Sequence, residues 1–126
     1  MDLQGFGALV LDNLPFEPND QQIQLVAALS RYCSAYTAGQ DRVFILNGYA
    51  GTGKTSVMGA LVRSLRTVAM PTVLLASTGR AAKVLSSFTG QPAFTSHRYI
   101  YNAPAVTPDG RVYASVKHNP HRNTVF

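Results

Sequence analysis

The chain has 126 residues, enough for one compact domain, and its hydrophobic content of 46% is sufficient for a packed core. Its lone cysteine, Cys33, excludes an internal disulfide, and no apolar stretch approaches the roughly 18 residues that a membrane span requires. These features predict a soluble, cytoplasmic protein without a secretion signal.

The net charge of +5 is unevenly distributed along the chain. Residues 1–41 carry five acidic side chains and one basic side chain, a balance of −4, whereas residues 42–126 carry ten basic side chains and only Asp109, a balance of +9. A segment this basic favours a polyanionic partner such as nucleic acid. A solvated basic surface without a partner is the alternative.

Residues 1–18 are expected to form a lead-in segment that ends in two prolines. Asn19 then suits the cap of a helix that continues to about Ala38 and is broken at Gly39. Cys33 shares an apolar face of this helix, so core packing is its expected role.

The middle of the chain is expected to alternate strand and helix. The apolar run at 43–47 predicts a buried parallel strand, and apolar residues at helical spacing predict a helix from about Lys54 to Thr67. Pro71 introduces a second predicted strand at Thr72 to Ala76. A parallel sheet flanked by helices places the chain in the α/β class.

A further helix is predicted to start after Thr78 and to end at Gly90, since glycine often adopts the left-handed conformation that follows a helix. A short helical turn is expected over His97 to Tyr101. The domain that these elements form is expected to span residues 19–105.

Residues 106–126 form a turn-rich tail, because prolines and the pair Asp109-Gly110 interrupt it repeatedly. Short edge strands that pair as a hairpin are expected at 111–116 and at 124–126.

A phosphate-binding loop is the clearest motif, because residues 48–55 match the pattern G-x-x-x-x-G-K-[ST]. Its glycines allow successive backbone N–H groups to face phosphate oxygens, Lys54 would bridge the β- and γ-phosphates of ATP, and the Thr55 hydroxyl would hold the Mg²⁺ ion. The predicted nucleotide contacts in this loop are Gly48, Tyr49, Ala50, Gly51, Thr52, Gly53, Lys54, Thr55 and Ser56. A glycine-rich turn that happens to contain Lys-Thr is the alternative.

A second candidate site follows the predicted strand at 72–76. Thr78, Gly79, Arg80 and Lys83 lie at a strand-to-helix junction, where free backbone N–H groups suit a phosphate of a nucleic-acid backbone. A capped helix with two exposed cations is the other interpretation, and both can hold, since caps and anion sites use the same donors.

Four segments together resemble RecD/Dda-like superfamily 1B DNA helicases. Residues 48–55, 77–83 and 95–98 resemble motif I, motif Ia and the following DNA-contact motif of that family, and residues 19–22 resemble its glutamine motif. The resemblance spans about residues 16–105 and implies part of a RecA-like P-loop NTPase domain. Tyr49, Ser77 and Ser96 depart from the residues that the family usually has at these positions.

The resemblance implies roles for individual residues. Gln22 would contact the adenine edge, Lys54 and Thr55 would serve the triphosphate and its metal, and one further set would line a single-stranded DNA track: Thr78, Gly79, Arg80, Lys83, Thr95 and His97. Asn19 and Gln22 also form a capping box, and His97 also suits an ordinary turn, so both alternatives stay open. Phe94 and Tyr99 suit either base stacking or buried packing.

Acidic residues are missing where ATP hydrolysis needs them. Phosphoryl transfer in P-loop enzymes uses a carboxylate near the metal and a residue that orients the attacking water, but residues 56–108 contain no acid and Asp109 lies in a turn signature. The sequence therefore predicts a chain truncated before the Walker B segment, with ATP hydrolysis near background.

The function expected from the resemblance is the ATP-binding portion of an ATP-dependent DNA helicase that moves 5′ to 3′ on single-stranded DNA. Its partners would be ATP, single-stranded DNA and the remaining helicase domains. A small P-loop kinase and a non-catalytic module that binds nucleotide and nucleic acid are the alternatives.

Overall fold

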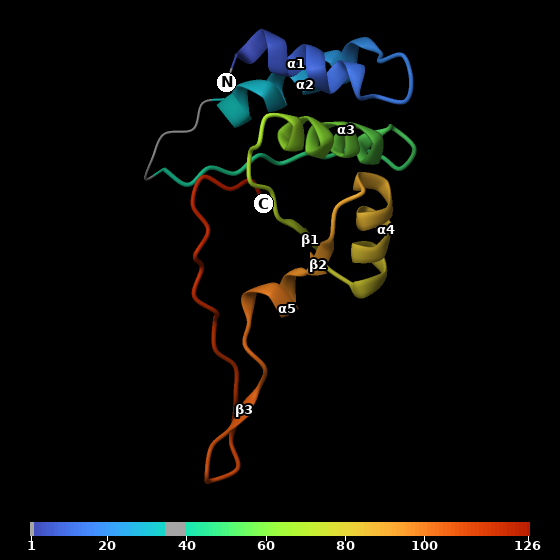
Figure 1. The fold of residues 1–126 in the computed structure, drawn as a ribbon. Helices are drawn as coiled ribbons and strands as arrows, with labels where there is room; N and C mark the ends of the chain where they lie inside the picture. The colour runs from blue at the N-terminus through green and yellow to red at the C-terminus, as the bar shows by residue number, and fades with distance from the viewer. Residues whose placement is uncertain (1, 35–39) are drawn as a thin grey trace. The chain divides into compact units, whose positions relative to one another are not determined.

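The computed structural model describes residues 2–34 and 40–126. The chain forms two compact units. One consists of Met1–Thr72 with Asn123–Val125, and the other consists of Val73–Arg122 with Phe126. Helices and a parallel sheet are both present, which confirms the predicted α/β class (Figure 1). Among the described residues, no helix has the length and apolar character needed to cross a membrane.

The first unit is helical. Helix α1 (Leu3–Asp12) contacts both α2 (Asp20–Ser34) and α3 (Lys54–Thr67), as Figure 1 shows. Helix α1 was not predicted, because residues 1–18 were expected to form a lead-in segment and no helix was assigned to them. Its start is nevertheless encoded locally, since the Asp2 carboxylate accepts a hydrogen bond from the Gly5 N–H at 2.8 Å.

The two predicted helices of this unit can be compared with their observed bounds. The observed α3 matches the predicted helix from Lys54 to Thr67. Helix α2 begins at Asp20, directly after the predicted cap Asn19. The predicted end of this helix at Ala38 and the break at Gly39 lie outside the described residues.

One face of each helix builds the core of the first unit. Leu65 of α3 is 1% exposed, and Cys33 of α2 is buried, as predicted. Burial raises the pKa of the Cys33 thiol, so the side chain stays neutral and acts as a small apolar group. The buried cluster consists of Phe6, Val10, Val26, Leu29, Cys33, Val57, Ala60, Leu61 and Leu65.

The prediction of a strand at residues 43–47 is wrong. This segment has no regular secondary structure, no described residue pairs with it in a ladder, and Val43 and Ile45 are 84% and 77% exposed. Only the alternate side chains Phe44 and Leu46 are half-buried, and the Phe44 ring packs edge-on against Tyr32 at a centroid distance of 5.5 Å. An apolar run supplies side chains for a sheet, but a strand also requires a neighbouring backbone.

The second unit contains the parallel sheet. Strand β1 (Leu74–Ala76) pairs with β2 (Ala93–Thr95) in parallel, with Ala76 opposite Thr95. The predicted strand at 72–76 is therefore shorter than expected and has a different partner from the predicted one, since β2 was not predicted. Thr72 instead forms an isolated bridge with Val125 within the first unit.

Helix α4 (Gly79–Thr89) connects the two parallel strands and packs on both. Its predicted boundaries are confirmed. The Thr78 hydroxyl accepts a hydrogen bond from the Ala81 N–H at 3.1 Å, and Gly90 ends the helix with φ of 68°.

After the parallel sheet, α5 (Ser96–Ile100) confirms the predicted helical turn, with both ends one residue earlier than predicted. Strands β3 (Ala105–Val106) and β4 (Val112–Tyr113) then form an antiparallel hairpin. The predicted strand at 111–116 is thus confined to β4 and an isolated bridge at Val116. The predicted strand at 124–126 is reduced to the bridge at Val125.

We expect Leu65→Ala to lower the free energy of unfolding by about 2 to 5 kcal/mol, because it leaves a cavity in the core of the first unit. Ile23→Ala is the matched control, since Ile23 lies on α2 with 43% of its surface exposed, and it should change stability by no more than about 0.5 kcal/mol. Urea denaturation followed by circular dichroism measures both. Equal effects of the two substitutions would contradict the assignment of the core.

Candidate functional site

The phosphate loop turns back on itself through two glycines. Gly51 and Gly53 have φ of 80° and 83°, in the left-handed region that side chains disfavour. At Gly48, an added Cβ would lie 3.1 Å from the Lys54 side chain and 3.2 Å from the Thr52 hydroxyl. The glycine spacing of the motif therefore corresponds to positions where the backbone needs it.

Helix α3 starts directly after this loop. Gly53 is its N-cap, and no side chain caps it. The first N–H groups of a helix have no partner within the helix, so an anion is a suitable partner for them. Thr55 and Ser56 lie in this first turn, with Thr55 exposed.

Lys54 folds back onto the loop. Its ammonium group donates hydrogen bonds to the carbonyl oxygens of Gly48 and Tyr49, the latter at 3.0 Å. The Thr52 hydroxyl donates to the same Tyr49 carbonyl at 2.8 Å. The Tyr49 ring itself is 89% exposed, so this residue contributes to the loop through its backbone.

Gln22 joins the start of α2 to the phosphate loop. Its side-chain oxygen accepts from the Asn19 N–H at 2.9 Å, and the Asn19 side-chain oxygen accepts from the Gln22 N–H at 2.9 Å. This reciprocal pair is the capping box that was left open as an alternative. The Gln22 side chain also donates to the Thr52 carbonyl at 3.2 Å, which brings the predicted adenine contact to the phosphate loop.

The residues present fit a triphosphate. The left-handed glycines let the loop backbone curl so that its N–H groups can face phosphate oxygens, the first turn of α3 has no side-chain cap, and Lys54 supplies a positive charge. Lys54 would then hold the phosphates and the exposed Thr55 hydroxyl would reach the Mg²⁺ ion that accompanies them.

Carboxylates do not complete this site in the described residues. No group of three or more His, Cys, Asp or Glu side chains there could hold a metal ion. Asp109 lies in the turn between β3 and β4, where it accepts a hydrogen bond from Thr107 and pairs with Arg111 at 3.2 Å. Asp109 therefore acts in the turn, as its sequence signature predicted.

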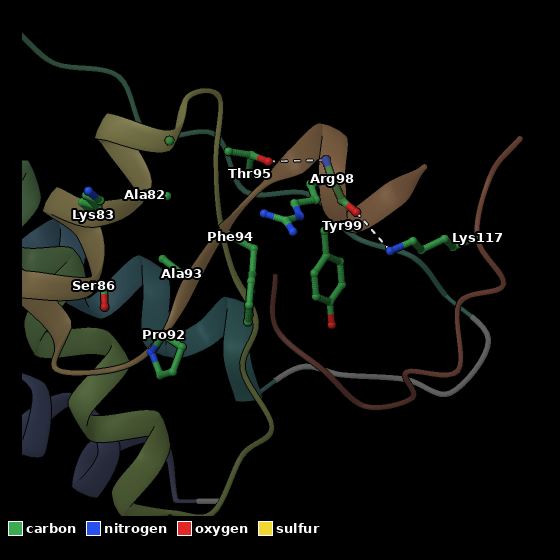
Figure 2. A pocket seen from close by; sticks show the side chains of 11 residues that line it. Ala82, Lys83, Ser86, Pro92, Ala93, Phe94, Thr95, Arg98, Tyr99 and Lys117 are labelled. Carbon is green, nitrogen blue, oxygen red and sulfur yellow. Dashed lines mark hydrogen bonds between the residues drawn. The ribbon is translucent and has the colours of Figure 1, made fainter. Parts of the chain in front are cut away.

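A basic groove lies in the second unit, between α4, β2 and α5 (Figure 2). It is an open cavity of about 760 Å³. Three of its described lining residues are basic and none is acidic, so the groove suits an anion. The groove is lined by Gly79, Ala82, Lys83, Ser86, Pro92, Ala93, Phe94, Thr95, Arg98, Tyr99 and Lys117.

Hydrogen bonds and a ring contact join the residues of β2, α5 and the tail that line the basic groove. Lys117 donates to the Arg98 carbonyl at 3.1 Å, and the Thr95 hydroxyl accepts from the Arg98 N–H at 3.4 Å, both drawn in Figure 2. The rings of Phe94 and Tyr99 lie 5.5 Å apart. The groove thus combines positive charges with an aromatic pair.

The six predicted DNA-contact residues divide into two groups. Gly79, Lys83 and Thr95 line the basic groove. Thr78, Arg80 and His97 do not: Thr78 caps α4, Arg80 is exposed on its first turn, and the exposed His97 ring lies 4.8 Å from the Tyr101 ring. The six residues therefore do not all line the basic groove.

Arg98 and Lys117 are groove residues that the sequence analysis missed. Arg98 was part of a quoted motif, and its position after Thr95 was the available signal. Lys117 lies 22 residues after Thr95 in the chain, and only the fold brings it to the groove.

We expect Gly51→Ala to lower the free energy of unfolding by roughly 1 to 2 kcal/mol, the usual cost of the left-handed conformation for alanine. No steric clash adds to this cost, because the new Cβ would have no other atom within 4 Å. Gly53→Ala should cost about 1 kcal/mol more, because its Cβ would lie 2.8 Å from the Gln22 amide nitrogen and disrupt the hydrogen bond to Thr52. Thermal or urea denaturation measures both variants, and an equal cost would argue against the contact between Gln22 and the loop.

Comparison with known proteins identifies the family of this chain. A family model described as an AAA domain matches residues 19–124, which covers most of the chain and includes both the phosphate loop and the basic groove. No solved structure matches the chain. Members of this family are P-loop NTPases and bind nucleotides. The chain belongs to the AAA domain family of P-loop NTPases.

Proposed function

We propose that this chain is the ATP-binding portion of an ATP-dependent DNA helicase of the RecD/Dda-like superfamily 1B, which moves along single-stranded DNA. Family membership supports the nucleotide-binding part. The basic groove is the observation that supports the DNA part, because it gathers three residues of the predicted DNA track with two further cations. The 5′ to 3′ direction and the remaining helicase domains are implied by the resemblance.

In the nucleotide site, the phosphate loop and Lys54 hold the triphosphate, and Thr55 holds Mg²⁺. Gln22 supplies the adenine contact from the start of α2. When the triphosphate binds, Lys54 exchanges its hydrogen bonds to the loop carbonyls for bonds to phosphate oxygens, because these oxygens carry negative charge.

In the DNA site, Lys83, Arg98 and Lys117 contact backbone phosphates. Phe94, which is 46% exposed, offers a ring face for an unpaired base. Contacts of this kind bind single strands with little sequence preference, as translocation along DNA requires.

The kinase alternative is weaker, because a small kinase needs acidic residues around its metal and its acceptor hydroxyl. The non-catalytic module remains a second candidate, supported by the lack of a metal-binding acidic cluster in the described residues. Titration of labelled single-stranded DNA with and without ATP separates the candidates: a kinase ignores DNA, and a regulatory module shows strong coupling between the two ligands.

We expect Arg98→Ala combined with Lys117→Ala to weaken single-stranded DNA binding by about tenfold or more, because two charge-assisted contacts are lost. Each phosphate contact contributes roughly 0.7 to the slope of log K against log salt, so the loss of two contacts should reduce the magnitude of that slope by about 1.4. Fluorescence anisotropy over a salt series measures both. Arg31→Ala is the control, since it removes an exposed cation on α2 of the first unit. A double variant with an unchanged salt slope would refute a role of the groove in DNA binding.

We expect the chain to bind a non-hydrolysable ATP analogue with Mg²⁺ and to hydrolyse ATP only near background. Calorimetry should show binding that Lys54→Ala reduces strongly, because the substitution removes the charge from the phosphate loop. Robust DNA-stimulated ATP turnover that disappears in Lys54→Ala would contradict the predicted lack of hydrolysis. Folded protein that binds no analogue would refute the proposed function as a whole.

A further inference from the structure

The Gln22 side chain contacts two parts of the first unit that lie far apart in the sequence. Its oxygen accepts from the Asn19 N–H and belongs to the start of α2, whereas its nitrogen donates to the carbonyl of Thr52, 30 residues later in the phosphate loop. A residue that only read a base would need no bond to the loop backbone.

Thr52 is also bonded to the part of the loop that holds Lys54. The Thr52 hydroxyl donates to the Tyr49 carbonyl, and the Lys54 ammonium donates to that same carbonyl. Hydrogen bonds therefore connect Gln22 to Thr52, Tyr49 and Lys54 in turn. Gly53 adds a steric constraint, because its backbone lies so close to the Gln22 amide that even a Cβ there would have to displace it.

We infer that Gln22 is a positioning residue for the phosphate loop, and that it increases the affinity of the loop for phosphate even when the ligand has no base. This inference rests on the proposed nucleotide binding and adds a second role to Gln22. Without the Gln22 side chain, the Thr52 carbonyl would lose this hydrogen bond, and Phe16 would remain as the other side chain that lies against Gly53.

The chemistry of the amide allows both roles at once. A glutamine side chain can donate two hydrogen bonds and accept two. The contacts to Thr52 and Asn19 use one donor and one acceptor, and an adenine edge presents one acceptor, N7, and one donor, the N6 amino group. Adenine would thus bind to a side chain that is already fixed against the loop, and base recognition would be coupled to phosphate binding.

Inorganic tripolyphosphate with Mg²⁺ is the probe that separates these roles, because it has no base. Gln22→Met keeps the length of the side chain but loses its bonds to Thr52 and Asn19. We expect it to raise the Kd for tripolyphosphate about fivefold, because the lost bond to the loop is worth about one neutral hydrogen bond. The amide ¹⁵N resonance of Gly53, whose peptide unit contains the Thr52 carbonyl, should also shift.

Asn19→Ala is the matched control. It removes the bond from the Gln22 N–H to the Asn19 side-chain oxygen but leaves the bond from the Gln22 side chain to Thr52 in place. We expect it to leave the tripolyphosphate Kd within about twofold of the parent, although it weakens the start of α2 by a similar amount. Calorimetry with ATP and with tripolyphosphate, on variants shown to be folded, completes the comparison.

Each other outcome overturns the inference in its own way. If Gln22→Met weakens ATP but not tripolyphosphate, Gln22 acts on the base alone and the proposed nucleotide binding stands. If Asn19→Ala weakens tripolyphosphate as much as Gln22→Met does, the effect comes from the start of the helix. If the parent binds neither ligand, the proposed function itself fails.

Discussion

The burial of α3 is the constraint on which the nucleotide site depends. Its apolar face lies in the core of the first unit, so the position of its first turn is fixed by packing. That first turn has no side-chain cap and follows two left-handed glycines. The same helix thus stabilises the unit at one face and presents unpaired backbone donors at one end, and the core is what keeps those donors in place.

Local signals in the sequence predicted the start of α2 and both ends of α4, although α1 was missed. Asn19, Thr78 and Gly90 act through residues three or four positions away, so their effect does not depend on the rest of the fold. The strands were harder to predict. The apolar segment 43–47 lacks a described partner strand, whereas the short β2 pairs with β1. Strand formation depends on a distant backbone, which composition does not reveal.

The candidate sites follow the same division. The phosphate loop is contiguous, so its glycines and Lys54 could be identified from spacing alone, and the structure shows left-handed φ angles at Gly51 and Gly53. The basic groove gathers side chains from separate elements. Lys83 and Thr95 belonged to recognisable motifs, but Lys117 is brought to the groove by the chain returning from the β3–β4 hairpin, and no motif marks it.

The state of Cys33 has a practical consequence for studying this protein in solution. The chain has one cysteine, and that side chain is buried with a thiol that burial keeps protonated. Thiolate is the form that reacts with maleimide reagents, so the native residue is a slow target. A cysteine introduced beside the basic groove would be labelled selectively, and a dye there would report ligand binding without removal of the native cysteine.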